Sequence, residues 1–112
     1  MTKPGYLGEF EQLVLLAVMR LGPESYGVSI RREIEACTGR DVSLGAIYPT
    51  LDRLEAKGYV RSNIGPPTGG RGGRSKRHIV LEPEGESALR RSRAMFNALW
   101  EGHTSLPERG SD

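Results

Sequence analysis

Apolar residues recur at helical spacing in the first part of the chain. Between residues 7 and 21 they occupy positions 10, 13, 14, 16, 17, 18 and 21, which makes an apolar face wider than a single stripe. Gly22 and Pro23 then end the helix. Because the apolar face is so wide, we expect this helix to be covered on more than one side.

Two further helices are predicted, joined by a short turn. Ser25 is expected to cap a helix over 26–38, and Gly39 to supply its left-handed C-terminal residue. The apolar face of this helix is formed by Tyr26, Ile30, Ile34 and Cys37. Ser43 is expected to cap a third helix over 43–57, which ends at a glycine. Its apolar positions are Leu44, Ile47, Tyr48, Leu51 and Leu54.

The second half of the chain changes to strand patterns before it returns to a helix. Residues 59–64 and 76–81 are expected to be short strands, and the Gly/Pro-rich segment 65–75 joins them as a long-looped hairpin. A last helix begins near Pro83, with acidic residues in its first turn. Its apolar stripe consists of Ala88, Leu89, Met95, Phe96, Leu99 and Trp100.

This order of elements predicts a mainly α (α+β) fold, a winged helix-turn-helix with a two-stranded β wing. In that geometry the third helix reads DNA, and its first turns carry mostly small or hydroxyl-bearing side chains that permit close approach. Pro49 breaks the helix rule there, because it removes the hydrogen bond to the Gly45 carbonyl, and such departures mark functional or strained positions. For Tyr48 two roles stay open, core packing and contact with a phosphate.

The charge distribution supports a polyanionic partner more than the net charge does. The chain has 112 residues and a formal charge of +2, yet the stretch 57–81 carries six cations and no carboxylate, so the remainder sums to −4. The basic residues of the wing are expected to follow a phosphate backbone or enter a minor groove. A solvated Gly/Arg linker is the plain alternative.

Two motifs resemble the PadR family of bacterial transcriptional regulators. The first is G-x-IYPTL-x-RLE-x-KG at residues 45–58, and the second is L-x-PEG at 81–85, after the basic wing. The resemblance covers about residues 7–100. It implies a homodimer that places two recognition helices on a pseudo-palindromic operator and represses transcription; activation stays open as an alternative.

The resemblance and the patterns together divide the chain and assign its surfaces. Residues 7–82 are expected to form the DNA-binding domain, 83–101 the C-terminal dimerisation helix, and 102–112 a disordered polar tail. The residues expected at DNA are Tyr26, Ser43, Leu44, Gly45, Ala46, Tyr48, Pro49, Thr50, Arg53, Arg71, Arg74, Ser75, Lys76 and Arg77. Those expected at the dimer interface are Phe10, Leu13, Val14, Ala17, Leu89, Met95, Phe96, Leu99 and Trp100. Packing within one subunit is the alternative for the second set.

The resemblance also implies regulation by a small aromatic effector near the dimer interface. Trp100 is the residue to examine, because an indole stacks on flat ligands, although a tryptophan on an apolar stripe also serves as an interface anchor.

Other classes of protein are disfavoured by the residues present. His78 and His103 have no metal-ligand spacing with Cys37, and the glycine-rich loop lacks the P-loop order, so we expect no enzyme, no metal and no cofactor. Cys37 is expected to be a small buried residue, and His78 a strand residue near phosphate or simply at the surface. No apolar run reaches membrane-spanning length, and a single cysteine without a signal peptide suits the cytoplasm. An RNA-binding or protein-interaction winged-helix adaptor is the competing function.

Overall fold

The computed structural model describes residues 7–64 and 76–101, so the predicted tail at 102–112 lies outside the described residues. The element order matches the predicted one, with a short 3-10 turn, η1, added after the first helix. The elements are α1 (Glu9–Leu21), η1 (Gly22–Glu24), α2 (Gly27–Thr38), α3 (Leu44–Ala56), β1 (Val60–Ile64), β2 (Arg77–Leu81) and α4 (Pro83–Glu101).

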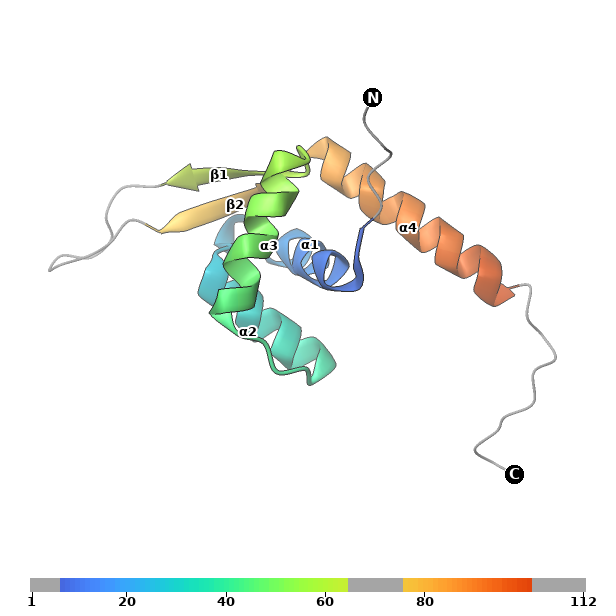
Figure 1. Ribbon diagram of the computed structural model, residues 1–112, viewed down its shortest axis with the longest axis horizontal. Coiled ribbons are helices and arrows are strands. Elements are labelled where there is room, and N and C mark those ends of the chain that lie inside the picture. The colour runs from blue at the N-terminus through green and yellow to red at the C-terminus, as the bar shows by residue number, and fades with distance from the viewer. Residues whose placement is uncertain (1–6, 65–75, 102–112) are drawn as a thin grey trace, which may run out of the picture.

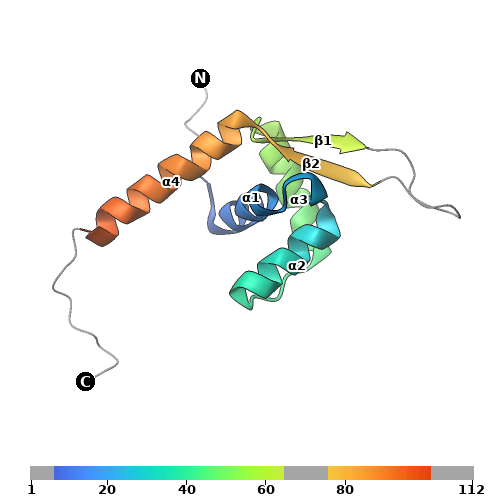
Figure 2. The same ribbon diagram turned by 180° about the vertical axis from the view of Figure 1, so that it is seen from behind.

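The body of the fold is a bundle of α1, α2 and α3, with the two strands leaving it on one side and α4 on the other (Figures 1 and 2). The core consists of aliphatic side chains from all three helices and from the strands, among them Leu15, Val18, Ile30, Ile47, Leu51, Leu54, Val60 and Ile79. Helix α1 is buried along much of its length, as its wide apolar face predicts, but Leu16 and Met19 stay exposed.

The wing is an antiparallel pair in which Val60 lies opposite Leu81 and Ile64 opposite Arg77. Each strand begins one residue later than predicted. The N–H of Ile79 donates to the carbonyl of Ser25 at 2.9 Å, so β2 is fixed to the chain between η1 and α2 as well as to β1. The wing strands are therefore joined to the helical body through the backbone.

The predicted cap of α2 at Ser25 is wrong by one residue. Tyr26 is the N-cap residue, and its N–H donates to the hydroxyl of Ser29 at 2.9 Å. Ser25 is fully buried, and its hydroxyl lies within hydrogen-bond distance of the carbonyls of Val18 and Gly22. The turn η1 directs Ser25 back against the end of α1, which leaves its hydroxyl unable to reach the α2 backbone.

The ends of α3 are as predicted. The hydroxyl of Ser43 accepts the N–H of Ala46 at 3.2 Å, and Gly58 has a φ of 81°, the left-handed conformation that follows a helix end. Gly39 ends α2 in the same way, with a φ of 75°. Pro49 lies inside α3 on its exposed side.

The buried residues of helix α4 lie in its first half. They are Gly85, Ala88, Leu89 and Ser92, and the hydroxyl of Ser92 donates to the Gln12 side chain of α1 at 2.7 Å. After Ser92 every described residue of α4 is exposed. The helix thus extends away from the three-helix body (Figure 2).

The expectation of a buried Cys37 is also wrong. Cys37 is exposed, and its sulfur lies 3.5 Å from a carboxylate oxygen of Glu33. The residue is on the apolar side of α2, but no residue of α2 after Ile34 is buried, because the last turn extends past the helices that cover the earlier ones.

Candidate nucleic-acid interface

The first turns of α3 present small side chains to solvent. Gly45, Ala46 and Pro49 are exposed, while Leu44 is half-buried and Ile47 lies in the core. The N-terminus of a helix attracts anions through its free N–H groups and its dipole. Because Pro49 has no N–H, the Gly45 carbonyl lacks the helix hydrogen bond that residue 49 would otherwise donate. Gly45 lies on the exposed side of the helix.

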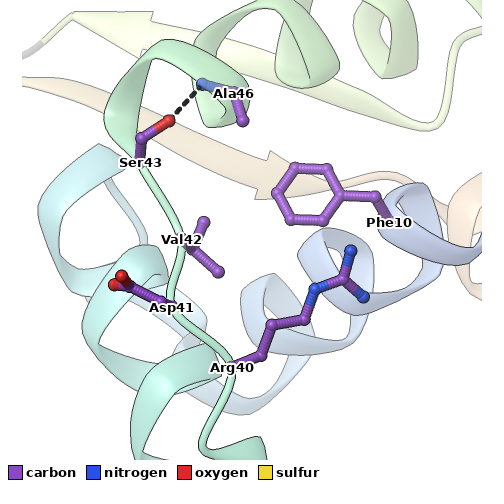
Figure 3. A pocket seen from close by; sticks show the side chains of 6 residues that line it. All are labelled: Phe10, Arg40, Asp41, Val42, Ser43 and Ala46. Atoms are coloured by element: carbon purple, nitrogen blue, oxygen red, sulfur yellow. Dashed lines mark hydrogen bonds between the residues drawn. The ribbon is translucent and has the colours of Figure 1, made fainter.

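A shallow pocket of ≈ 360 Å³ lies beside this helix start, between α1 and the turn that joins α2 to α3 (Figure 3). The Arg40 guanidinium lies 5.6 Å from the centre of the Phe10 ring and pairs with Glu9 at 3.0 Å. Phe10, which was expected at the dimer interface, is therefore placed against the turn before α3, where Val42 and Ala46 also line the pocket.

The start of α2 lies next to the start of β2. The ammonium of Lys76 is 4.2 Å from the centre of the Tyr26 ring, and His78 meets the same ring edge-on at 5.7 Å. A ring nitrogen of His78 is 3.2 Å from the carbonyl of Pro23. This cluster places a cation, a phenol and a helix N-terminus together, which is a suitable combination for a phosphate.

Tyr48 connects the two helix starts. Its side chain is 39% exposed, and its hydroxyl lies so close to Gly27 that a Cβ atom built there would be 2.3 Å from it. Both roles considered from the sequence are thus compatible with its position, because the ring covers the first turn of α2 while part of it remains accessible. We call the surface formed by Tyr26, Ser43, Gly45, Ala46, Tyr48, Pro49 and Lys76 the α2–α3 surface.

Two residues expected at DNA are occupied within the protein. Thr50 is 1% exposed, and its hydroxyl donates to the Ala46 carbonyl at 2.9 Å, so it belongs to the core. Arg53 donates to the Thr50 hydroxyl and lies 3.6 Å from the carboxylate of Glu11. Arg53 remains more than half exposed and retains donors on its outer side.

Glu11 holds the end of α3 against the start of α1. It is 8% exposed and accepts two hydrogen bonds from Lys57, at 3.0 and 3.1 Å, and one from the N–H of Gly8. Burial raises the pKa of this carboxyl, but the bonds from Gly8 and Lys57 and the nearby Arg53 charge outweigh it and hold the pKa below the ordinary value. Helix α3 is therefore fixed at its C-terminal end by a buried ionised group.

Arg77 is likewise engaged in internal contacts. Its guanidinium donates to the Ser62 hydroxyl at 2.8 Å, to Asp52 at 3.0 Å and to Glu55 at 3.1 Å. The sequence indicates its charge but not these partners, of which Asp52 and Glu55 lie on α3 and Ser62 on β1. The remaining expected wing residues, Arg71, Arg74 and Ser75, lie outside the described residues.

The expected interface residues fall into two groups. Val14, Ala17 and Leu89 are buried within the single chain, and Leu13 packs against its core. The others on α4 are exposed, namely Met95, Phe96, Leu99 and Trp100. A groove of ≈ 840 Å³ lies between α1 and α4, and its apolar lining consists of Leu16, Met19, Leu89 and Ala94. The sequence did not predict Leu16 and Met19 at an interface; Leu16 lies on the wide apolar face of the first helix, whereas Met19 is not among the positions that define that face.

No group of three or more potential metal-ligating side chains occurs among residues 7–64 and 76–101. Within the same ranges, no helix combines the length and apolar character that crossing a bilayer demands.

Comparison with known proteins agrees with this geometry. The model of the transcriptional regulator PadR-like family matches residues 15–91. A PadR family regulator from Eggerthella lenta is 26% identical, with a TM-score of 0.64 over 84% of this chain and 81% of that one. A PadR-like transcription factor from Bacteroides fragilis is 24% identical, with a TM-score of 0.68 over 83% and 84% of the chains.

A more distant structure extends the likeness of the fold. F93 from STIV, a winged-helix DNA-binding protein, is 22% identical, with a TM-score of 0.64 over 82% of this chain and 91% of that one. None of the curated proteins matches the chain. The fold class predicted from the sequence is confirmed, and members of the matched family are transcriptional regulators rather than enzymes. The chain belongs to the PadR-like family of transcriptional regulators.

Proposed function

We propose that the protein is a homodimeric transcriptional repressor that binds a pseudo-palindromic operator in the cytoplasm through its α2–α3 surface. The observation that supports DNA contact most strongly is the contiguity of that surface. Tyr48 joins the starts of α2 and α3, and Lys76 adds a cation beside Tyr26. Residues 83–101 act as the dimerisation helix.

Within the proposed complex, side chains divide by the kind of contact they make. Lys76, Tyr26 and the N-terminus of α2 meet phosphates, which fixes the protein on the duplex. Ser43, Leu44, Gly45, Ala46 and Pro49 bring the start of α3 close to base edges, since none has a bulky charged group. The residues Arg71 and Arg74 add further phosphate contacts, and Ser75 lies between these arginines and Lys76 in the sequence.

The proposed dimer rests on the exposed second half of α4. Leu99 is 76% exposed and Phe96 is 52% exposed, and single helices of soluble proteins seldom leave such a stripe uncovered. The groove between α1 and α4 exposes the apolar side chains of Leu16 and Met19 and is bordered by polar and charged ones, namely Gln12, Glu86, Arg90, Arg93 and Asn97. We propose that α4 of a second copy occupies this groove, which places two recognition helices on one face of DNA about 34 Å apart.

We also propose that a small aromatic effector binds the protein and weakens its binding to the operator. Trp100 lies in the exposed stripe next to Leu99, at the end of the described part of α4. A flat compound that stacks on the indole would enter the dimer interface and alter the spacing of the recognition helices. Quenching of the fluorescence of this single tryptophan tests such binding directly.

The deciding experiment is fluorescence anisotropy with duplex DNA from upstream of the protein's own gene and with a scrambled duplex. Titrations run over a salt series for the wild type, for Arg71→Ala/Arg74→Ala and for Ala46→Glu. We expect tight binding to the upstream duplex with a steep salt slope, a uniform loss on both duplexes for the arginine variant, and a specific loss for Ala46→Glu. Absence of binding to either duplex at low salt contradicts the proposal, and binding to a single-stranded RNA of equal length would favour the RNA-binding alternative.

Sedimentation of Leu99→Glu tests the dimer. We expect this variant to be monomeric, whereas Arg91→Glu, which changes an exposed charge on the same helix, stays dimeric. A wild-type protein that sediments as a monomer at micromolar concentration contradicts the proposed homodimer.

A further inference from the structure

Arg77 is the residue through which the wing meets the recognition helix. It lies at the start of β2, and its guanidinium reaches two carboxylates of α3 that are 25 and 22 residues away in sequence, Asp52 and Glu55. Its Nε atom donates to the hydroxyl of Ser62 on β1 at 2.8 Å. Arg77, which lies on β2, therefore contacts β1 and α3 at once. We call the four residues Arg77, Asp52, Glu55 and Ser62 the wing clamp.

The clamp is a closed network. The Ser62 hydroxyl donates to Glu55 at 2.9 Å, and the Ser62 N–H donates to the other oxygen of the same carboxylate at 3.4 Å. The hydrogen bond from Ser62, followed by that from Arg77, holds the pKa of Glu55 below its ordinary value despite partial burial. Glu55 is thus ionised at neutral pH, and the planar guanidinium suits a geometry in which three acceptors surround it.

The position of Asp52 gives the clamp a second consequence. Asp52 is 69% exposed and follows Gly45 and Pro49 by seven and three residues, so it lies on the same side of α3 as the small residues of the α2–α3 surface. A bare carboxylate there would repel phosphate. The pairing with Arg77 compensates only part of the charge of Asp52, because the same guanidinium also faces Glu55, and it withdraws Arg77, which is 27% exposed, from acting as a free cation.

We propose that Arg77 is a positioning residue for DNA recognition, which sets the wing strands relative to α3 and compensates part of the charge of Asp52, rather than a phosphate contact. This inference rests on the proposed DNA-binding function. Losing the clamp removes the side-chain connection between β2 and α3, while the backbone bond from Ile79 to Ser25 still holds the wing on the body, so the wing meets DNA in a less precise register with the recognition helix. Discrimination between operator and non-specific DNA then falls, while the number of phosphates neutralised stays the same.

The test compares Arg77→Ala, Asp52→Ala/Glu55→Ala and the combined triple variant with Lys76→Ala, a neighbouring cation outside the clamp. Affinities for the upstream and scrambled duplexes are measured over a salt series. We expect Arg77→Ala to lower the ratio of the two affinities about tenfold, the scale of one lost charge-assisted contact, and to weaken both complexes as Asp52 loses its partner. The salt slope should change by much less than the value of about 0.9 for a lost phosphate contact. Lys76→Ala should weaken both duplexes alike and reduce the slope by about 0.9.

The carboxylate variant, Asp52→Ala/Glu55→Ala, distinguishes a positioning role of the clamp from a simple effect of its charges on DNA binding. Removing Asp52 and Glu55 would tighten binding to both duplexes if only electrostatics mattered, whereas the clamp requires the same loss of discrimination as Arg77→Ala. The triple variant should lose no more than either parent, since all three changes break one network. A slope that falls by about 0.9 in Arg77→Ala, or a carboxylate variant that keeps full discrimination, overturns the proposal.

Hydrogen exchange of the DNA-free protein provides a readout that does not depend on DNA binding. Arg77→Ala and the carboxylate variant should each speed exchange in 60–64 and 77–81 severalfold and leave α1 unchanged. If the wild type binds neither duplex, the proposed function fails, and this exchange alone then decides whether the clamp holds the wing. Unchanged exchange in the two strands, or equal acceleration in α1, overturns the clamp.

Discussion

Gly85 lies directly against the backbone of Tyr59, so that a Cβ atom added at residue 85 would be 2.3 Å from the Tyr59 carbonyl oxygen. That carbonyl also accepts the N–H of Glu82 at 2.9 Å. The first turn of α4 is thus set on the end of the wing by backbone contact. The glycine of the L-x-PEG motif is required there because any side chain would displace the helix.

Gly85→Ala should therefore destabilise the fold, although alanine is the better helix former. We expect the free energy of unfolding to fall by about 1–3 kcal/mol, the usual cost of overpacking a tight contact. Urea denaturation at a fixed protein concentration measures it. Ser87→Ala, at an exposed position of the same helix, is the control and should change stability by less than about 0.5 kcal/mol; an equal effect of both changes would show that Gly85 has no special contact.

Gly27 and Tyr48 form a second close approach, between α2 and α3. A Cβ atom on residue 27 would lie 2.3 Å from the Tyr48 hydroxyl and 2.5 Å from the ring carbon that bears it. We expect Gly27→Ala to expel the Tyr48 ring and to lower stability by about 1 kcal/mol or more.

In a Tyr48→Ala background the same Gly27→Ala change should stabilise the protein slightly, by less than about 0.5 kcal/mol, because only the preference for alanine at the first position of α2 then remains. Thermal unfolding of the wild type, the two single variants and the double variant measures this double-mutant cycle. An effect of Gly27→Ala with the same sign in both backgrounds would contradict the contact.

The elements were predictable because their signals are local. Helix spacing, the Ser43 cap and the glycines after α2 and α3 each depend on residues within about one turn. Ser25 misled for the opposite reason. Its hydroxyl is used by the end of α1, seven residues earlier, and a sequence pattern does not show which way the intervening turn will direct a side chain.

The sequence predicted the kind of ligand that the candidate site would bind, but not all the contacts that its residues make within the protein. Basic residues next to a helix-turn-helix indicate DNA, but the sequence does not show that Arg77 is engaged by carboxylates of α3. Thr50 looked available in the first turns of that helix, yet it faces the core. The contacts of both residues depend on packing between elements, which fixes the direction of each side chain after the elements themselves are formed.

Cys37 provides a direct check on the end of α2. Because its side chain is exposed, we expect a maleimide to modify it fully in the native protein without denaturant. Mass spectrometry over time measures the modification, and Cys37→Ser should show none. Cys37→Ser should also alter the free energy of unfolding by less than about 0.5 kcal/mol, as for an exposed residue. Modification that requires denaturant would place this turn of α2 in a buried contact.

Glu11 makes the stability of the fold depend on pH in a defined direction. Since folding lowers the pKa of this carboxyl from 4.5, its contribution is present above pH 4.5 and is lost as the pH falls through the lower value of the folded state. At pH 7, the free energy of unfolding of Glu11→Gln should be about 1–2 kcal/mol lower than that of the wild type. This is the scale of hydrogen bonds to a charged group that is mostly buried. The gap between wild type and variant should stay constant from pH 7 to pH 5 and narrow below.

Glu9→Gln is the matched control, because Glu9 lies in the same first turn of α1 but is 81% exposed at its side chain. It shares the helix-dipole position of Glu11 without its buried contacts, so we expect a gap from wild type of less than about 0.5 kcal/mol. Urea unfolding at a fixed protein concentration from pH 3 to pH 7 measures both variants. A Glu11→Gln gap that is absent at pH 7, or one that widens toward pH 3, would contradict an ionised Glu11 that holds the end of α3 through Lys57.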